Sequence, residues 1–352
     1  MIDWTKSMSQ NFEYYEIDPI SYRDKRLLKT VKSASISRDM ETDTLGSATI
    51  DINELFGETY IRIYLVAIQN GVTERVPLGV FLMQTPSSSF DGKVQTVSVD
   101  AYTPLIELKE KPMPLGYSLL KNDNIMNEAY LLTRNNCRAN VVKTTSDKTL
   151  QADFTANTND TPLTYIRDLL ALAKYHFDLD ANGNILFAPN QTIDELQPVW
   201  TYTDDNSSIL FPEVSLRHDL YGIPNVVEVV CSTGTDVYTA RVENVDPNSP
   251  TSIPNRGREI IHRDTNPSLS GIPTKAQIDE YAETLLKELS FVEYKITYSH
   301  GYCPVRIGDG VRLNYKSAGL DNIRAKVISQ NIRCQQGCTV NETAIFKKQL
   351  WK

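Results

Sequence analysis

The sequence predicts an α+β protein that is mainly β. Residues 59–102 read as three β-runs separated by two tight turns. Strand patterns return from Trp200 to the end of the chain, and helical patterns are confined to the middle and to one late segment. Short strands with turn signals between them are typical of a barrel or a sandwich.

The segment 59–102 shows the strand pattern most clearly. Tyr and Arg alternate with Ile and Leu between Tyr60 and Leu65, which predicts a strand with one buried face. Asn70–Gly71 and Asp91–Gly92 are turn signals, because Gly accepts the positive φ of hairpin turns. Two further strands are expected within 29–40 and 41–52. We therefore predict a β-barrel domain over residues 1–104.

The pattern changes after Tyr102, where a proline-containing connector begins. Helices are expected over Asn122–Asn136 and from Thr161 to about Tyr175, the second with Pro162 at its first helical position. A hairpin with the turn Ala-Asn-Gly-Asn follows. We therefore predict an inserted α+β domain over residues 105–200, consisting of two helices and a hairpin.

The last part of the chain returns to strands. Residues 223–233 and 236–244 predict a hairpin that turns at Gly234, and four further strand patterns close the chain. Residues 246–290 combine a long Pro- and Ser-rich excursion with one helix, for which Thr274 and Gln277 form a capping box. We therefore predict a second barrel domain over residues 201–352.

Composition limits the function classes. The 352 residues include 41% hydrophobic and 23% charged side chains, and the net charge of −8 argues against a general binder of nucleic acid or of anionic membranes. The N-terminus lacks the pattern of a signal peptide, and no apolar run reaches the length of a membrane span. Five scattered cysteines favour reduced thiols and cytoplasmic synthesis.

One motif is suggestive of calcium. Asp178–Ile185 fits the first positions of an EF-hand loop, but the position where a bidentate Glu is required holds Pro189. The segment also lies between strand-like runs rather than between helices. We interpret it as a hairpin turn built on Asn-Gly.

Cysteine and histidine give no metal signature. Cys334 and Cys338 flank Gln-Gln-Gly, a spacing of neither a zinc knuckle nor a thioredoxin motif, and we interpret them as thiols beside a turn with left-handed Gly337. Their redox state stays open. The histidines form no HxH or HExxH pattern, which favours structural or surface roles; they are His176, His218, His262 and His300.

Catalytic motifs are also missing from the sequence. It contains no G-x-S-x-G elbow, P-loop or G-x-G-x-x-G, although a glycosidase-type pair among the 44 acidic residues stays open. We predict no catalytic, cofactor-binding or metal-binding residues and no enzymatic activity.

The order of the segments resembles the hub proteins of phage baseplates and phage-tail-like bacteriocins, which belong to contractile injection systems. The resemblance covers most of the chain and rests on the segments 33–52, 75–108, 161–189, 223–230 and 306–315. Within them lie an LGVF strand, a strand ending in Asp-Ala-Tyr, the helix-plus-hairpin unit, a Pro-Asn-Val-Val strand and a Gly308–Asp309 turn.

The resemblance implies two barrels similar to tail-tube subunits and a homotrimer. Such a trimer adapts a six-fold tail tube to a three-fold central spike around a channel. The implied partners are the tube ring, the spike, the tape measure protein and the baseplate wedge proteins, within a virion or tail-like particle made in a bacterial host. Two alternatives stay open. One is a tail-associated lysin hub that cleaves cell walls, and the other is a distal-tail adaptor with six-fold assembly.

Overall fold

The computed structural model describes residues 2–53, 57–90, 92–93, 95–232, 236–267 and 274–351. The chain divides into two compact units. Unit 1 comprises 1–214 and 298–343, and unit 2 comprises 215–297 and 344–352. Strands greatly exceed helices, which confirms the mainly β, α+β class. The predicted domain boundaries near 104 and 200 stay predictions.

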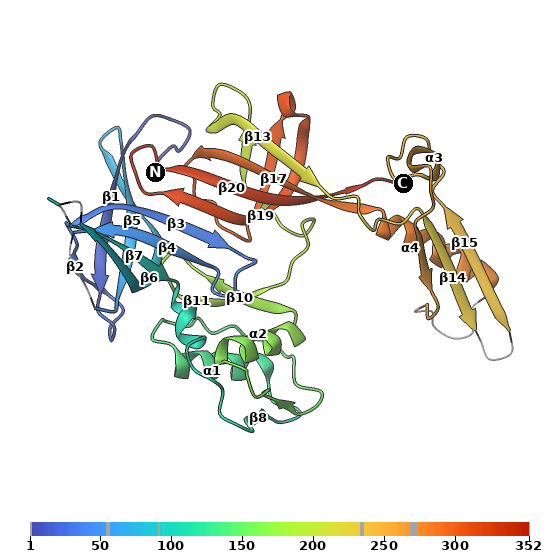
Figure 1. Ribbon diagram of the computed structural model, residues 1–352, viewed down its shortest axis with the longest axis horizontal. Helices are drawn as coiled ribbons and strands as arrows, with labels where there is room; N and C mark the ends of the chain where they lie inside the picture. Colours follow the sequence, from blue (N-terminus) through green and yellow to red (C-terminus); the bar gives the residue numbers. More distant parts are fainter. Residues whose placement is uncertain are drawn as a thin grey trace. The chain divides into compact units, whose positions relative to one another are not determined.

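The strands of unit 1 come from both ends of the chain (Figure 1). They join in the order β13-β17-β20-β19-β3-β4-β7-β6-β5-β1-β2, with β18 attached to β19 and β12 to β18. The bounds are β1 (Ser9–Ile17), β2 (Asp24–Leu27), β3 (Val31–Asp39), β4 (Gly46–Ile52), β5 (Thr59–Gln69), β6 (Val72–Phe90), β7 (Gln95–Tyr102), β12 (Pro198–Thr203), β13 (Leu210–His218), β17 (Phe291–Gly301), β18 (Gly310–Tyr315), β19 (Leu320–Arg333) and β20 (Thr339–Gln349). The strands β13, β17 and β20 contain residues of both units.

The join between the two ends is the antiparallel pairing of β3 with β19. Ile36 lies opposite Ile332 in this pair, and both are fully buried in one apolar core. Val340 of β20 and Ile50 of β4 belong to the same core. The early and late strands of unit 1 are therefore held together by backbone pairing and by shared burial of apolar surface.

The β5–β6 hairpin forms as predicted, with positive φ at Asn70 and Gly71. The prediction of one buried face was wrong, because every residue from Tyr60 to Leu65 is buried. One face contributes Ile61, Ile63 and Leu65 to the sheet core, while Tyr60 packs into a second core formed by the helices. In the predicted β6–β7 turn, Asp91 lies outside the described residues.

The second core is formed mainly by the middle segment of the chain. Helices α1 (Ile125–Asn136) and α2 (Pro162–Leu172) lie side by side below the sheet in Figure 1. Asn124 and Thr161 cap them, as the sequence indicates. The other elements here are η1 (Pro104–Leu108), β8 (Ser118–Leu119), β9 (Phe154–Thr155), β10 (Tyr175–Leu179) and β11 (Ile185–Pro189).

Unit 2 is a three-stranded sheet with a helix packed on it. Its elements are β14 (Val226–Ser232), β15 (Val237–Glu243), α3 (Ile253–Arg256), β16 (Ile261–Asp264) and α4 (Lys275–Leu289). The capping box of Thr274 and Gln277 is confirmed, and α4 buries Ile278, Ala282 and Leu286 against β14 and β15.

Within the Pro- and Ser-rich excursion, β16 pairs in parallel with β14. The predicted turn at Gly234 lies outside the described residues. Within the described part of the chain, no helix is both long and apolar enough to cross a membrane.

Candidate functional site

A cluster of polar side chains lies inside unit 1, around the carboxylate of Glu342 on β20. Tyr298 donates to it at 2.5 Å, Gln330 at 2.7 Å and Tyr202 at 3.2 Å. The His300 Nε2 lies 3.5 Å from the second carboxylate oxygen. Strands β12, β17, β19 and β20 supply these side chains, so one carboxylate ties four strands together.

The electrostatics of the cluster follow from burial and from pairing. Burial alone would lower the pKa of His300, but its hydrogen bonds with Cys303 and Glu342 outweigh burial and raise the pKa to about 10. Burial and the charge of Glu342 raise the pKa of Tyr298 and of Tyr202 well above the usual tyrosine range. At neutral pH the His300 side chain is therefore an imidazolium, and both tyrosines are neutral phenols.

The cluster brings together a cysteine, a histidine and a glutamate, which are residue types found in nucleophilic triads. The Cys303 Sγ lies 3.8 Å from the His300 Nδ1, but that nitrogen is 2.7 Å from the carbonyl oxygen of Gly301. Cys303 is 1% exposed, and His300 and Glu342 are 0% exposed. A substrate has no access to a thiol closed off in this way, so we assign the cluster a structural role.

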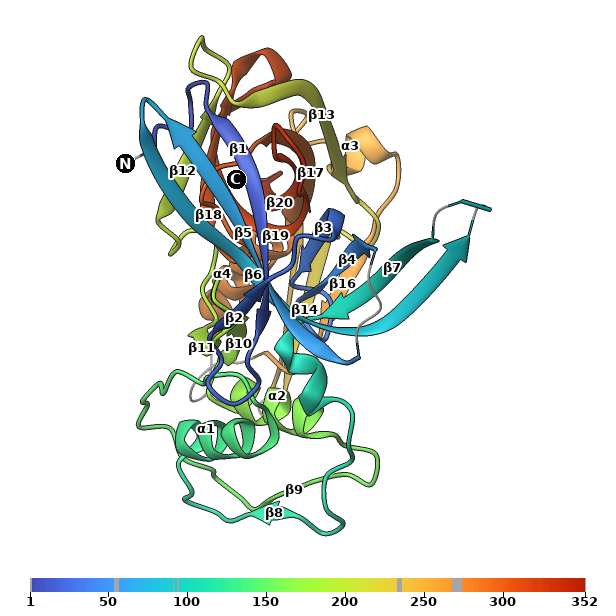
Figure 2. The same ribbon diagram turned by 90° about the vertical axis from the view of Figure 1, so that its left-hand side faces the viewer.

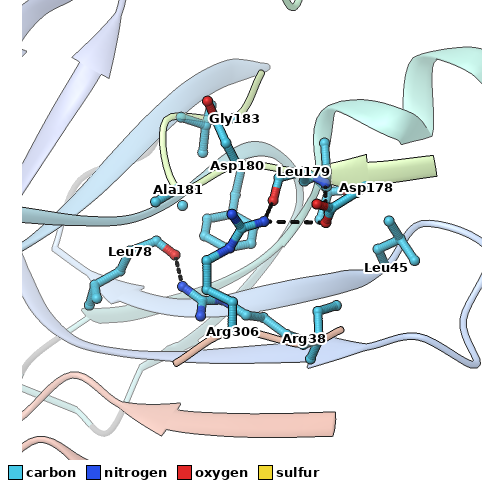
Figure 3. Close-up of a pocket in the computed structure, with 14 residues that line it drawn as sticks. Arg38, Leu45, Leu78, Asp178, Leu179, Asp180, Ala181, Gly183 and Arg306 are labelled. Atoms are coloured by element: carbon cyan, nitrogen blue, oxygen red, sulfur yellow. Dashed lines mark hydrogen bonds and ion pairs between the residues drawn. The ribbon is translucent and has the colours of Figure 1, made fainter. Parts of the chain in front are cut away.

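A second polar junction lies where the β10–β11 hairpin meets the sheet (Figure 3). Arg306 donates to the carbonyl of Leu179 and to Asp178 Oδ1, the latter at 3.2 Å. On the sheet, Arg38 donates to the carbonyl of Leu78 at 2.6 Å. Two buried or half-buried guanidinium groups thus hold backbone carbonyls at this junction. A guanidinium is suited to this role because it presents several N–H donors in one rigid plane.

The hairpin turn packs closely on β6. Gly183 has a φ of +79°, and a Cβ there would lie 2.5 Å from the Cβ of Val80. Asp180 uses Oδ1 to accept from the backbone N–H groups of Asn182 and Asn184, at 2.8 and 2.9 Å. The EF-hand-like stretch is therefore a hairpin whose first carboxylates hold Arg306 and close the turn.

The small cavities near this junction are shared by the hairpin and the sheet. One of about 40 Å³ lies between Arg38 and the turn, with Arg306 on its wall. A polar one of about 190 Å³ also has Arg306 on its wall and is lined by Asp309 and Lys326. Among the described residues, no three or more His, Cys, Asp or Glu side chains are grouped for a metal ion.

The remaining predicted residues are scattered. Cys334 and Cys338 are free, buried thiols in the sheet core, beside Gly337 with a φ of +88°, and burial raises the pKa of Cys338 to about 12. The Nδ1 of His176 contacts Asn190, His218 stacks on Tyr294, and His262 is exposed on β16. Only His300 of these residues enters the Glu342 cluster.

The sequence reasoning missed the other members of that cluster. Glu342 stands between Val340 and Ala344 on the buried face of β20. A carboxylate in the apolar register of a strand is the signal that identifies it, because a buried charge requires partners. Its partners Tyr202 and Tyr298 belong to distant segments, and nothing in the sequence pairs them with Glu342.

Comparison with solved structures finds this fold in tail proteins. The tail protein from Neisseria meningitidis MC58 matches with a TM-score of 0.60 and 12% identity, over 97% of this chain and 98% of that one. The 43 kDa tail protein of prophage MuSo2 from Shewanella oneidensis also gives 0.60 and 12%, over 96% and 98%. No family model matches the sequence, and neither does any curated protein. The chain has the fold of these tail proteins.

Proposed function

We propose that this chain is a structural subunit of the baseplate hub of a phage tail or tail-like particle. The observation that carries the proposal is the match to tail proteins over almost the full length of both chains. The buried state of Cys303, His300 and Glu342 supports a structural rather than an enzymatic role.

The proposed assembly is a homotrimer that adapts a six-fold tail tube to a three-fold spike. Open strand edges in unit 1 support assembly through sheets. Within the described residues, β6 pairs with β5 as far as Met83, whereas its pairing with β7 continues to Phe90. Figure 2 shows the two strands extending beyond their neighbours, and Phe90 is 70% exposed. In the part of the chain that the structure describes, the edge of β6 beyond Met83 that faces away from β7 has no partner strand, and such an edge can pair with another chain.

Charge supports a channel through which DNA passes without sticking. Each chain carries a formal charge of −8, so three chains carry −24. A largely acidic wall repels the phosphate backbone, whereas stable binding requires neutralising Lys and Arg contacts. The proposed partners are the tube ring, the spike, the tape measure protein and the wedge proteins of the same particle.

Mass measurement of the purified protein tests the proposal. Three chains of 39.7 kDa give about 119 kDa, which we expect at micromolar concentration for the protein alone, or as part of a heavier complex on addition of a tube or spike protein. A stable monomer with no ring on addition of these partners contradicts the hub, and a hexamer favours the distal-tail adaptor. Clear lysis of bacterial cell walls by this chain in a zymogram favours the lysin.

A further inference from the structure

Unit 2 carries a polar groove in two adjoining parts, and Asp219 lines both of them. The first part is a cavity of about 380 Å³ between the loop after β13 and the end of α3, lined by Tyr221, Arg256 and Arg258. The second part is a cavity of about 660 Å³, lined by residues of β13, α4, β17 and β20 that include Arg217 and Lys347.

The first part is built around a fixed guanidinium. Arg256 donates to the carbonyls of Ile223 at 2.7 Å and of Leu220 at 3.0 Å. Asp219 accepts from the backbone N–H of Tyr221 at 2.8 Å, which holds the facing loop. The walls of this part are therefore organised without a ligand, which lowers the entropy cost of binding.

Two like charges are held together in this part. Burial and the nearby charge of Arg258 lower the pKa of Arg256. Within the described residues, the Arg258 side chain has no acidic partner, whereas Arg241 on β15 is paired with three glutamates. An incoming anion would relieve the repulsion between Arg256 and Arg258.

The whole groove has the opposite sign from the chain. Its lining carries the cations Arg217, Lys295, Lys347, Arg256 and Arg258 against three acidic residues, Asp219, Glu288 and Glu293, whereas the complete chain is at −8. This local excess of positive charge favours an acidic ligand by complementarity.

Exposed rings lie beside the charges. Tyr221 is 92% exposed and Phe291 is 43% exposed, while His218 stacks on Tyr294 with ring centroids 4.6 Å apart. Tyr and Arg are enriched in the central contacts of protein interfaces. A ligand with both carboxylates and aromatic or apolar side chains would use both kinds of surface.

We propose that this groove binds an acidic segment of another polypeptide of the tail particle, a proposal that rests on the hub function. The cationic side chains receive its carboxylates, and Tyr221 and Phe291 pack against its apolar side chains. Nucleic acid is the less suitable anion, because a long polyphosphate would also meet the field of a chain with net charge −8.

The test uses the full-length protein and two fluorescent probes. One probe is a short peptide of Asp and Glu with one Tyr and one Phe, and the other replaces each acid by Lys. Fluorescence anisotropy measures the affinity of each peptide. We expect the acidic peptide to bind at least about ten-fold more tightly than the basic one, and we expect salt to weaken its binding.

A charge-reversal pair locates the site. We expect R258E/K347E to weaken the acidic peptide about ten-fold or more, and the neutral R258Q/K347Q to weaken it less. Lys348 is exposed on the same strand but does not line the groove, so K348E is the matched control and should change binding less than about two-fold.

Three outcomes would overturn the proposal. The first is equal affinity of the protein for both peptides. The second is an equal loss of affinity in R258E/K347E and in K348E. The third is single-stranded DNA that binds as tightly as the acidic peptide and depends in the same way on Arg258 and Lys347. Mass measurement of the same samples reports the trimer separately, so a failed groove and a failed hub assignment give different results.

Discussion

Replacing Glu342 by Gln tests whether the buried carboxylate holds the strands of unit 1 together. Gln keeps the shape of the side chain, so the substitution removes charge without creating a cavity. If the carboxylate acted only as a neutral acceptor, losing one of its three hydrogen bonds would cost about 1 kcal/mol. The charge of His300 would instead lose its buried counterion, and breaking such a pair costs about 3–5 kcal/mol.

We therefore expect E342Q to lower the free energy of unfolding of unit 1 by about 3 kcal/mol or more. Urea unfolding followed by tryptophan fluorescence measures this loss. The chain has three tryptophans, and a W351F background leaves only Trp4 and Trp200, both in unit 1. Glu213 is exposed in unit 1, so E213Q should change stability by less than about 0.5 kcal/mol.

The double variant E342Q/H300Q separates the pair from its surroundings. We expect it to be less destabilised than the sum of its single variants, because each single change leaves one charge unpaired. A loss below about 1 kcal/mol for E342Q, or strict additivity with H300Q, would refute the role assigned to the cluster.

Three further predictions use the same unfolding assay. The pKa of His300 in the folded protein, about 10, lies above its unfolded value of 6.5, so unit 1 should lose stability as pH rises between these values, by up to about 1.4 kcal/mol per pH unit. The H300Q substitution should flatten this pH dependence. A stability that rises over this range contradicts the assignment. Gly183→Ala should cost more than Gly71→Ala by about 1–3 kcal/mol, because both glycines have positive φ but only the first would press a Cβ into Val80; equal costs would remove the packing explanation. Leu286→Ala should lower the free energy of unfolding of unit 2 by about 2–5 kcal/mol. It should therefore lower the urea midpoint reported by the unit 2 tryptophan but not the midpoint reported by those of unit 1. An unchanged unit 2 midpoint would contradict the place of Leu286 in the core.

Local chemistry predicted the parts of the fold that depend on neighbours in sequence. Thr161 and Thr274 mark helix starts through side-chain caps, and Asn70–Gly71 marks a hairpin through backbone conformation. These signals act over a few residues, so they can be read from the chain directly.

The parts that the sequence did not predict depend on distant residues. The pairing of Ile36 with Ile332 joins opposite ends of the chain, and both strands carry ordinary strand patterns that name no partner. The burial of Tyr60 follows from helices that begin more than sixty residues later. The Glu342 cluster likewise draws its members from four strands, so only the three-dimensional arrangement reveals it.

Class-averaged electron micrographs of the purified assembly test the hub assignment most directly, because they report symmetry as well as size. We expect a three-fold ring that surrounds a central channel. The two barrels expected in each chain should give this ring a six-fold outline. A ring with true six-fold symmetry, or isolated single chains in the presence of tube and spike proteins, would contradict it.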